Sequence, residues 1–175
     1  MGRALKFRYP LLKQQTLTIA LLDTSSSTLG GSGLSQAKGV LKQLAIECYV
    51  KRQQLCIMTF GNNRIQTVLK VQRAPKNIER TLNKITGGGG TPLRKALTEA
   101  RDFILRQHKH YPLQEHRLFI FTDGRSKEEM QDIEFTETAL TIIDTECGAV
   151  KLGHSKNLAT HLGANYMHLQ SLPQV

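Results

Sequence analysis

The sequence predicts a single α/β domain, built on a doubly wound, mostly parallel sheet of six strands with one antiparallel edge strand and helices on both faces. Three observations support this. The 175 residues suit one domain. Short apolar runs alternate with amphipathic stretches along the chain. Most of the runs are apolar end to end, which is typical of strands buried on both faces. A chain with 39% hydrophobic and 22% charged residues is neither disordered nor fibrous.

The first half of the chain predicts three strands and two helices. Leu17–Asp23 is an apolar run that ends in a carboxylate, and Leu55–Phe60 is a second buried strand. Between them, Leu34–Val50 carries apolar residues at steps of three and four, which predicts an amphipathic helix. Ile65–Val71 follows a tight turn and alternates in polarity, so we expect it to pair antiparallel with the preceding strand. A proline then begins a helix over Pro75–Ile85.

The second half continues the alternation. A second proline begins a helix over Pro92–Lys109, and Arg117–Asp123 is the third central strand. Ala139–Asp144 is the fourth central strand. A short helix over Ser155–Leu162 and a last strand over Tyr166–Leu169 complete the domain.

We expect the domain to span residues 16–175, with residues 1–15 forming a basic leader or the remnant of a linker. No apolar run approaches the ~20 residues that cross a bilayer, and no signal-peptide pattern is present. The three cysteines form neither a metal-binding spacing nor an even set for disulfides. These features predict a cytoplasmic protein with reduced thiols and no membrane partner.

The net charge of +10 is unevenly distributed. Residues 51–109 contain thirteen Lys and Arg against three acids, whereas five acids fall within residues 128–137. This predicts an electrically lopsided molecule that attracts an acidic partner. The basic residues are not interleaved with aromatic ones, so we do not expect a nucleic-acid partner.

Three polar segments are expected to meet at one edge of the sheet. Asp23, Ser25 and Ser27 follow the first strand, Thr91 follows four glycines, and Asp123 follows a central strand. Ligands of open α/β sheets bind beyond the carboxyl ends of the strands. Two carboxylates and three hydroxyls suit a hard divalent cation, with Mg²⁺ expected and Mn²⁺ or Ca²⁺ as alternatives. So few charged ligands leave a coordination position for a carboxylate from a partner protein.

The pattern Asp23-x-Ser25-x-Ser27, with Thr91 behind a Gly-rich loop and Asp123 in Thr-Asp-Gly, resembles the metal-ion-dependent adhesion site of von Willebrand factor A (vWA) domains, which are integrin I-like. The resemblance implies that Ser25, Ser27 and Thr91 are ligands. It also implies that Asp23 and Asp123 bind the metal directly or through water.

Further features are similar to the C-terminal domain of the D-type subunits of magnesium and cobalt chelatases. They are the Gly-Gly-Gly-Gly-Thr-Pro-Leu motif, Phe-Thr-Asp-Gly-Arg, and Thr-Ile-Ile-Asp144-Thr-Glu146. That resemblance implies a non-catalytic platform in a complex of tetrapyrrole biosynthesis. Its partners would be a AAA+ ATPase, which offers an acidic residue to the metal, and a tetrapyrrole-binding chelatase subunit. The sequence departs from the family in having Ser26 where Gly is usual, and it contains no P-loop, so the domain is either excised or works beside a separate ATPase.

Other interpretations stay open at this stage. The domain could serve a MoxR-type AAA+ ATPase, or it could be a metal-dependent hydrolase or phosphatase that uses Asp23 as a nucleophile. Asp144 and Glu146 could line the metal site, but a cap or a salt bridge to Arg125 or Lys151 is the favoured interpretation. Arg125 and Lys127 could guide an acidic partner or simply lie on the surface. The six histidines are expected to be structural or at the surface.

Overall fold

The computed structural model describes residues 15–25, 33–126, 128–130, 132–147 and 152–172, and it confirms the α/β architecture. Within these ranges, six strands form one sheet in the order β3-β2-β1-β4-β5-β6, and only β3 runs antiparallel to its neighbour. The strands are β1 (Thr16–Asp23), β2 (Gln54–Gly61), β3 (Arg64–Arg73), β4 (Glu115–Thr122), β5 (Thr138–Asp144) and β6 (Asn165–His168). The helices are α2 (Gly33–Val50), α3 (Glu79–Asn83), α4 (Leu93–His110), α5 (His154–Leu162) and the 3-10 helix η1 (Leu169–Ser171).

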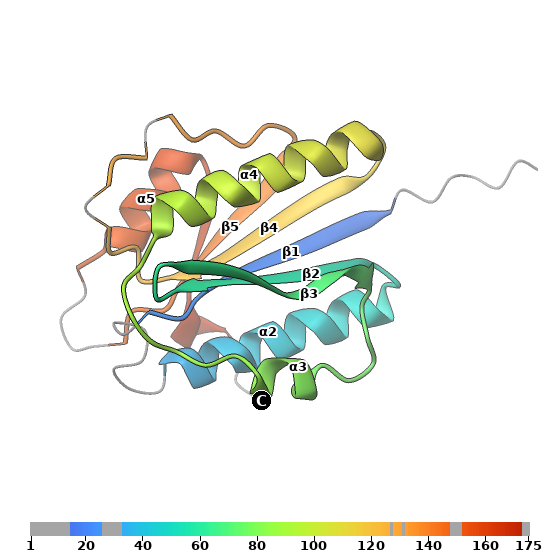
Figure 1. Ribbon diagram of the computed structural model, residues 1–175, viewed down its shortest axis with the longest axis horizontal. Coiled ribbons are helices and arrows are strands. Elements are labelled where there is room, and N and C mark those ends of the chain that lie inside the picture. The colour runs from blue at the N-terminus through green and yellow to red at the C-terminus, as the bar shows by residue number, and fades with distance from the viewer. Residues whose placement is uncertain (1–14, 26–32, 127, 131, 148–151, 173–175) are drawn as a thin grey trace, which may run out of the picture.

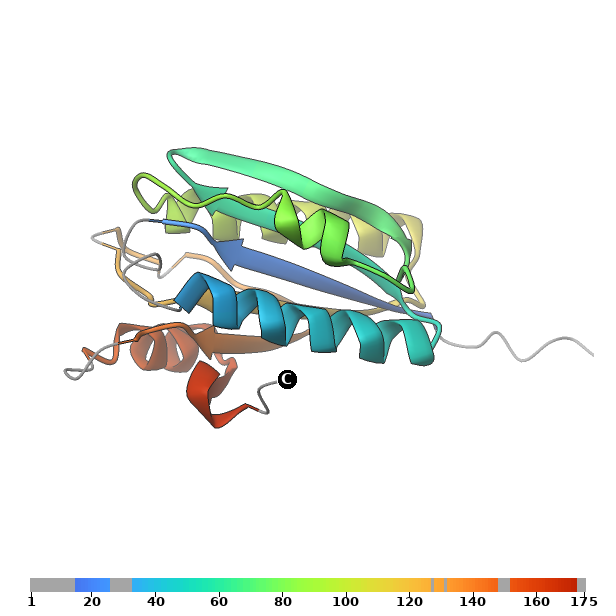
Figure 2. The same cartoon turned by 90° about the horizontal axis from the view of Figure 1, so that it is seen from below.

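Helices cover both faces of the sheet. In Figure 1, α4 and α5 lie above the sheet, with α2 and α3 below it, and Figure 2 shows α2 from the lower side. Two apolar cores result, one beneath α4 and α5 and the other against α2 and α3. All eight residues of β1 are buried because this strand lies in the middle of the sheet and is covered on both sides. That explains why its sequence shows no polar alternation.

The chain reverses its winding direction at β1. β1 pairs with β2 on one side and with β4 on the other, both in parallel. In the strand register, Asp23 is the partner of Phe60 and Leu22 is the partner of Phe121, so the carboxyl ends of these strands meet at one edge. Loops leaving β1 and β4 therefore diverge to opposite faces there, which creates the crevice typical of ligand sites in open α/β sheets.

Two element predictions need correction. The helix expected over Pro75–Ile85 is confined to Glu79–Asn83, because the Asn77 side chain accepts a hydrogen bond from the Glu79 N–H (2.9 Å) and forms a turn ahead of it. The strand expected to end at Asp123 ends at Thr122, so Asp123 is the first residue of the loop. Of the expected leader, residues 1–14 lie outside the described residues.

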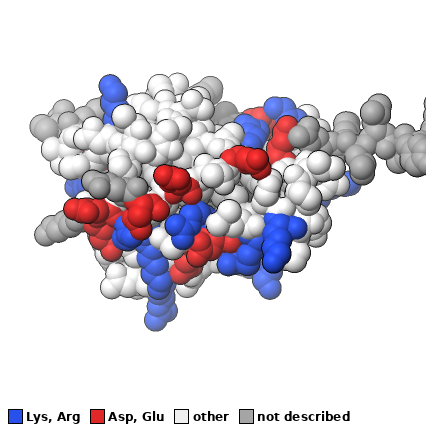
Figure 3. All heavy atoms as spheres, turned by 90° about the horizontal axis from the view of Figure 1, so that it is seen from above, with Lys and Arg blue, Asp and Glu red and all other residues white. Residues whose placement is uncertain are grey.

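The acidic segment after β4 is in part neutralised by α4. Arg94 forms a two-pronged ion pair with Asp132 (2.6 and 2.7 Å), and Glu128 accepts a hydrogen bond from the Arg94 backbone. Figure 3 accordingly shows blue and red side chains against one another on the face that α4 and α5 cover. Across the described ranges, no helix is long and apolar enough to cross a membrane.

Candidate functional site

Asp23 is a buried carboxylate at the carboxyl end of β1. Its side chain is fully buried, and its two oxygens accept hydrogen bonds from the Ser25 N–H (2.8 Å) and the Thr122 hydroxyl (3.0 Å). Burial raises the pKa of Asp23 from 3.8 to about 6. The bonds from Ser25 and Thr122 oppose this rise, while the nearby charge of Asp123 adds to it. The fold thus holds a desolvated carboxylate beside a second one.

Asp123 lies near Asp23, in the turn that follows β4. It is 2% exposed and accepts a hydrogen bond from the Arg125 N–H (3.0 Å). The turn depends on Gly124, which has φ +72°, and a Cβ added there would lie 2.5 Å from the backbone nitrogen of Ser155. Ser155, at the start of α5, donates in turn to the Thr122 carbonyl (2.8 Å). These contacts hold the turn that carries Asp123 in position at the carboxyl end of β4.

The Gly-rich loop passes the end of β1 on its other side. The Gly88 N–H donates to the Thr24 carbonyl (2.7 Å), and the Thr24 N–H donates to the Phe60 carbonyl (2.8 Å). Gly89 has φ +76°, and a Cβ there would lie 2.4 Å from the Asn62 Cα, so only glycine fits. Thr91, half-buried, follows three residues after the Gly88 anchor, at the entry to α4.

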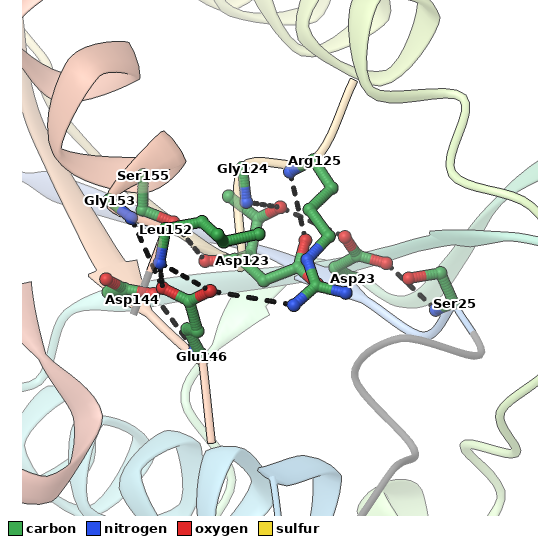
Figure 4. A network of polar contacts seen from close by, with 11 residues as sticks. Asp23, Ser25, Asp123, Gly124, Arg125, Asp144, Glu146, Leu152, Gly153 and Ser155 are labelled. Atoms are coloured by element: carbon green, nitrogen blue, oxygen red, sulfur yellow. Dashed lines mark hydrogen bonds and ion pairs between the residues drawn. The ribbon is translucent and has the colours of Figure 1, made fainter. Parts of the chain in front are cut away.

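Arg125 bridges two carboxylates on the α5 side of the site. Figure 4 shows its guanidinium between Asp123 and Glu146, at 3.5 Å from an oxygen of each. Glu146 is 3% exposed, and its oxygens accept hydrogen bonds from the backbone N–H groups of Leu152 and Gly153 (3.0 to 3.4 Å). Burial alone would raise the pKa of Glu146, but these bonds and Arg125 outweigh burial and lower it. Glu146 is therefore ionised at neutral pH, and its charge holds Arg125 in place.

Asp144 is satisfied by its own neighbours. Its oxygens accept hydrogen bonds from the Glu146 N–H (2.9 Å) and the Tyr166 hydroxyl (2.7 Å). Burial and the Asp144 charge raise the pKa of Tyr166 to about 12. Within the described residues, Asp144 caps a turn and Glu146 pairs with Arg125, the two contacts that the favoured interpretation expects.

The structure brings together three of the five expected site residues. Asp23, Ser25 and Asp123 converge at one edge of the sheet, as Figure 4 shows. The Gly-rich loop contacts the end of β1 through Gly88, and Thr91 follows it at the entry to α4, but no hydrogen bond joins Thr91 to the other three in the described part of the chain. Ser27 lies outside the described residues, as do Ser26, Lys127 and Lys151.

Comparison with known proteins identifies the family. The von Willebrand factor type A domain matches residues 18–125, which include Asp23, the Gly-rich loop and Asp123. The chain belongs to this family. This vWA domain resembles the manganese-loaded TRAP protein of Plasmodium vivax with a TM-score of 0.71 and 15% identity, over 90% of this chain and 70% of the other. It also resembles the SpRpn10 VWA domain with a TM-score of 0.63 and 15% identity, over 92% and 89%.

Among curated proteins, the vWA domain is similar to a magnesium-chelatase 67 kDa subunit of Chlorobaculum tepidum. The two are 27% identical over 90% of this chain, which corresponds to 29% of the longer protein. A similar subunit from Chlorobaculum parvum is 26% identical over the same shares. The domain thus spans less than a third of the length of these relatives.

Proposed function

We propose that this vWA domain binds a divalent metal ion through Asp23, Ser25, Ser27, Thr91 and Asp123 and presents it to a carboxylate of a partner protein. The observation that carries the proposal is the fully buried Asp23, whose charged form is disfavoured by its burial. A cation at the sheet edge would offset both that burial and the repulsion from Asp123.

The donor set fits a hard cation. Carboxylate and hydroxyl oxygens are the ligands that Mg²⁺ prefers, and Mn²⁺ and Ca²⁺ accept the same types. In the described part of the chain, no three His, Cys, Asp or Glu side chains gather as a metal site, but the proposed set has only two such residues and draws its other ligands from hydroxyls. Two carboxylates leave positive charge on the ion, which a partner's carboxylate would neutralise.

We place the domain in a magnesium- or cobalt-chelatase-type assembly, as a docking platform beside a AAA+ ATPase. The similarity to magnesium-chelatase subunits over most of this chain supports that setting. A MoxR-type AAA+ ATPase is the alternative partner. Within the described residues, no observation favours a hydrolase over metal-mediated docking.

The direct test is metal binding by isothermal titration calorimetry with Mn²⁺ and Mg²⁺. D23N removes a proposed ligand, and D144N is the matched control because Asp144 is also a buried acid at a strand end, with partners of its own. We expect D23N to abolish binding and D144N to keep it. Equal binding by wild type and D23N would refute the proposed site.

Docking is tested by capture from a native extract with Mg²⁺ and then with chelator. We expect an ATPase subunit to be retained by the wild type with Mg²⁺ and lost with chelator or with D23N. The same partners in both conditions would refute metal-mediated docking.

A further inference from the structure

A second polar cavity adjoins the proposed metal site on the side of the β2–β3 hairpin. It has a volume of about 240 Å³, and its walls come from the turn between β2 and β3, the end of α3 and the Gly-rich loop. Figure 1 shows the segment between α3 and α4 passing that end of the hairpin. Thr24, which lies between Asp23 and Ser25 in the chain, also lines the cavity, and its carbonyl is bonded to the Gly88 N–H (2.7 Å). The cavity and the metal site therefore share a wall.

The cavity is positively charged. Arg64 and Lys84 line it, and no acidic side chain does. Both side chains are exposed, and within the described residues neither has an ion pair or a side-chain hydrogen bond, unlike Lys42, which pairs with Glu79 (2.6 Å). A third cation, Lys38, donates to the carbonyl of Ile85, which also lines the cavity (2.7 Å). Cations gathered at one small polar cavity without an internal anion favour an external one.

The size of the cavity limits the ligand. At about 240 Å³ it is smaller than the roughly 300–1,000 Å³ of pockets that enclose whole small molecules. It accommodates one acidic side chain, which the Arg64 fork can bind through two parallel hydrogen bonds. A neighbouring acid on the same segment would reach the metal across Thr24.

We propose that the cavity between Arg64 and Lys84 binds a second carboxylate of the partner segment that docks on the metal, so that the domain selects paired acidic residues rather than a single one. This inference rests on the proposed metal-dependent docking and names the partner's chemistry: an acidic peptide segment with two acids close in sequence.

The test uses short fluorescent peptides of Gly and Ser that carry one glutamate, or two at varied separations, titrated with the domain in Mg²⁺ and followed by anisotropy. Wild type binds the best two-glutamate peptide about tenfold more tightly than the one-glutamate peptide, and the advantage shrinks as salt is added. R64Q/K84Q loses that advantage. K70Q/R73Q, which removes the same charge from exposed positions that do not line the cavity, keeps it.

Each outcome decides between the two proposals. Mg²⁺-dependent binding of both peptides with equal affinity overturns the second carboxylate site and leaves the metal site intact. Glutamate-peptide binding that survives chelator and D23N but not R64Q/K84Q supports the cavity and refutes the metal site. Inorganic phosphate binding that depends on Arg64 and Lys84, without any two-glutamate advantage, overturns the peptide assignment. Circular dichroism and melting curves establish that both double variants fold.

Discussion

Replacing Asp23 with asparagine is expected to stabilise the metal-free domain while it abolishes metal binding. The native pKa of about 6 lies roughly two units above the ordinary 3.8. At about 1.36 kcal/mol per unit, ionising Asp23 near pH 7 costs the folded state about 3 kcal/mol relative to the unfolded chain. D23N avoids that cost and keeps a carbonyl oxygen for the Ser25 N–H.

The sign of the pH dependence follows from the raised pKa. Between pH 4 and 6 the native state holds a proton that the unfolded chain has lost, so this group's contribution to the free energy of unfolding falls as the pH rises. The advantage of D23N over wild type should therefore grow from about 1 kcal/mol at pH 4.5 to about 3 kcal/mol at pH 7.

Urea unfolding in chelator, followed by circular dichroism at both pH values, measures this difference, because the titrating groups remote from Asp23 cancel between the two proteins. D144N is again the control. Adding Mg²⁺ should raise the stability of wild type but not of D23N, since only a protein that binds the ion in its native state gains from it. A difference between D23N and wild type that stays constant from pH 4.5 to 7 would refute the reasoning.

Three further predictions concern the scaffold. His116 is buried, neither ring nitrogen has a hydrogen-bond partner in the described structure, and burial together with His108 lowers its pKa. The contribution of His116 to the free energy of unfolding should thus fall as the pH drops below about 6.5, where the unfolded imidazole takes a proton, which is opposite in sign to the contribution of Asp23. H116L should remove this contribution in urea titrations, and a pH dependence identical to that of wild type would contradict this. G124A should lower the free energy of unfolding by about 2 kcal/mol or more in the same assay, because the added Cβ would meet the start of α5. A loss under about 0.5 kcal/mol would show that the turn does not require glycine. Cys48 and Cys56 are buried, and burial raises the pKa of both thiols, that of Cys56 to about 12. Neither should therefore react with a thiol reagent before the protein unfolds. Mass spectrometry that finds either cysteine labelled in the native protein would contradict this packing.

The convergence of Asp23 and Asp123 could be predicted because parallel strands bring their carboxyl ends to one edge. An apolar run that ends in a carboxylate marks such a strand end without any tertiary information. The antiparallel hairpin could also be predicted from the sequence, since Gly61 and two asparagines indicate a tight turn between the strands.

The position of α3 and the role of Arg125 needed the structure. Pro75 is a plausible first helical residue, and only the local bond from Glu79 to Asn77 shows that the helix begins later. The sequence allowed Glu146 to pair with Arg125, Lys151 or a metal. Within the described residues Glu146 pairs with Arg125, and the N–H groups of Leu152 and Gly153 hold its carboxylate.

The cavity beside Thr24 could not be predicted from the sequence, in which only the run of glycines marks this region. Arg64 and Lys84 are twenty residues apart on different elements, and they share a cavity only because the Gly-rich loop folds against the hairpin. Clusters of this kind depend on contacts between distant segments, which no local pattern encodes.

A crystal structure of the domain grown with Mn²⁺ tests most directly whether oxygen ligands from separate loops meet around one hard ion. We expect one anomalous peak at the sheet edge, about 2.0–2.3 Å from oxygens of Ser25 and Ser27, with Thr91, Asp23 and Asp123 bound directly or through water. An ion at any other position, or none at saturating Mn²⁺ in a crystal that leaves this edge open, would contradict it.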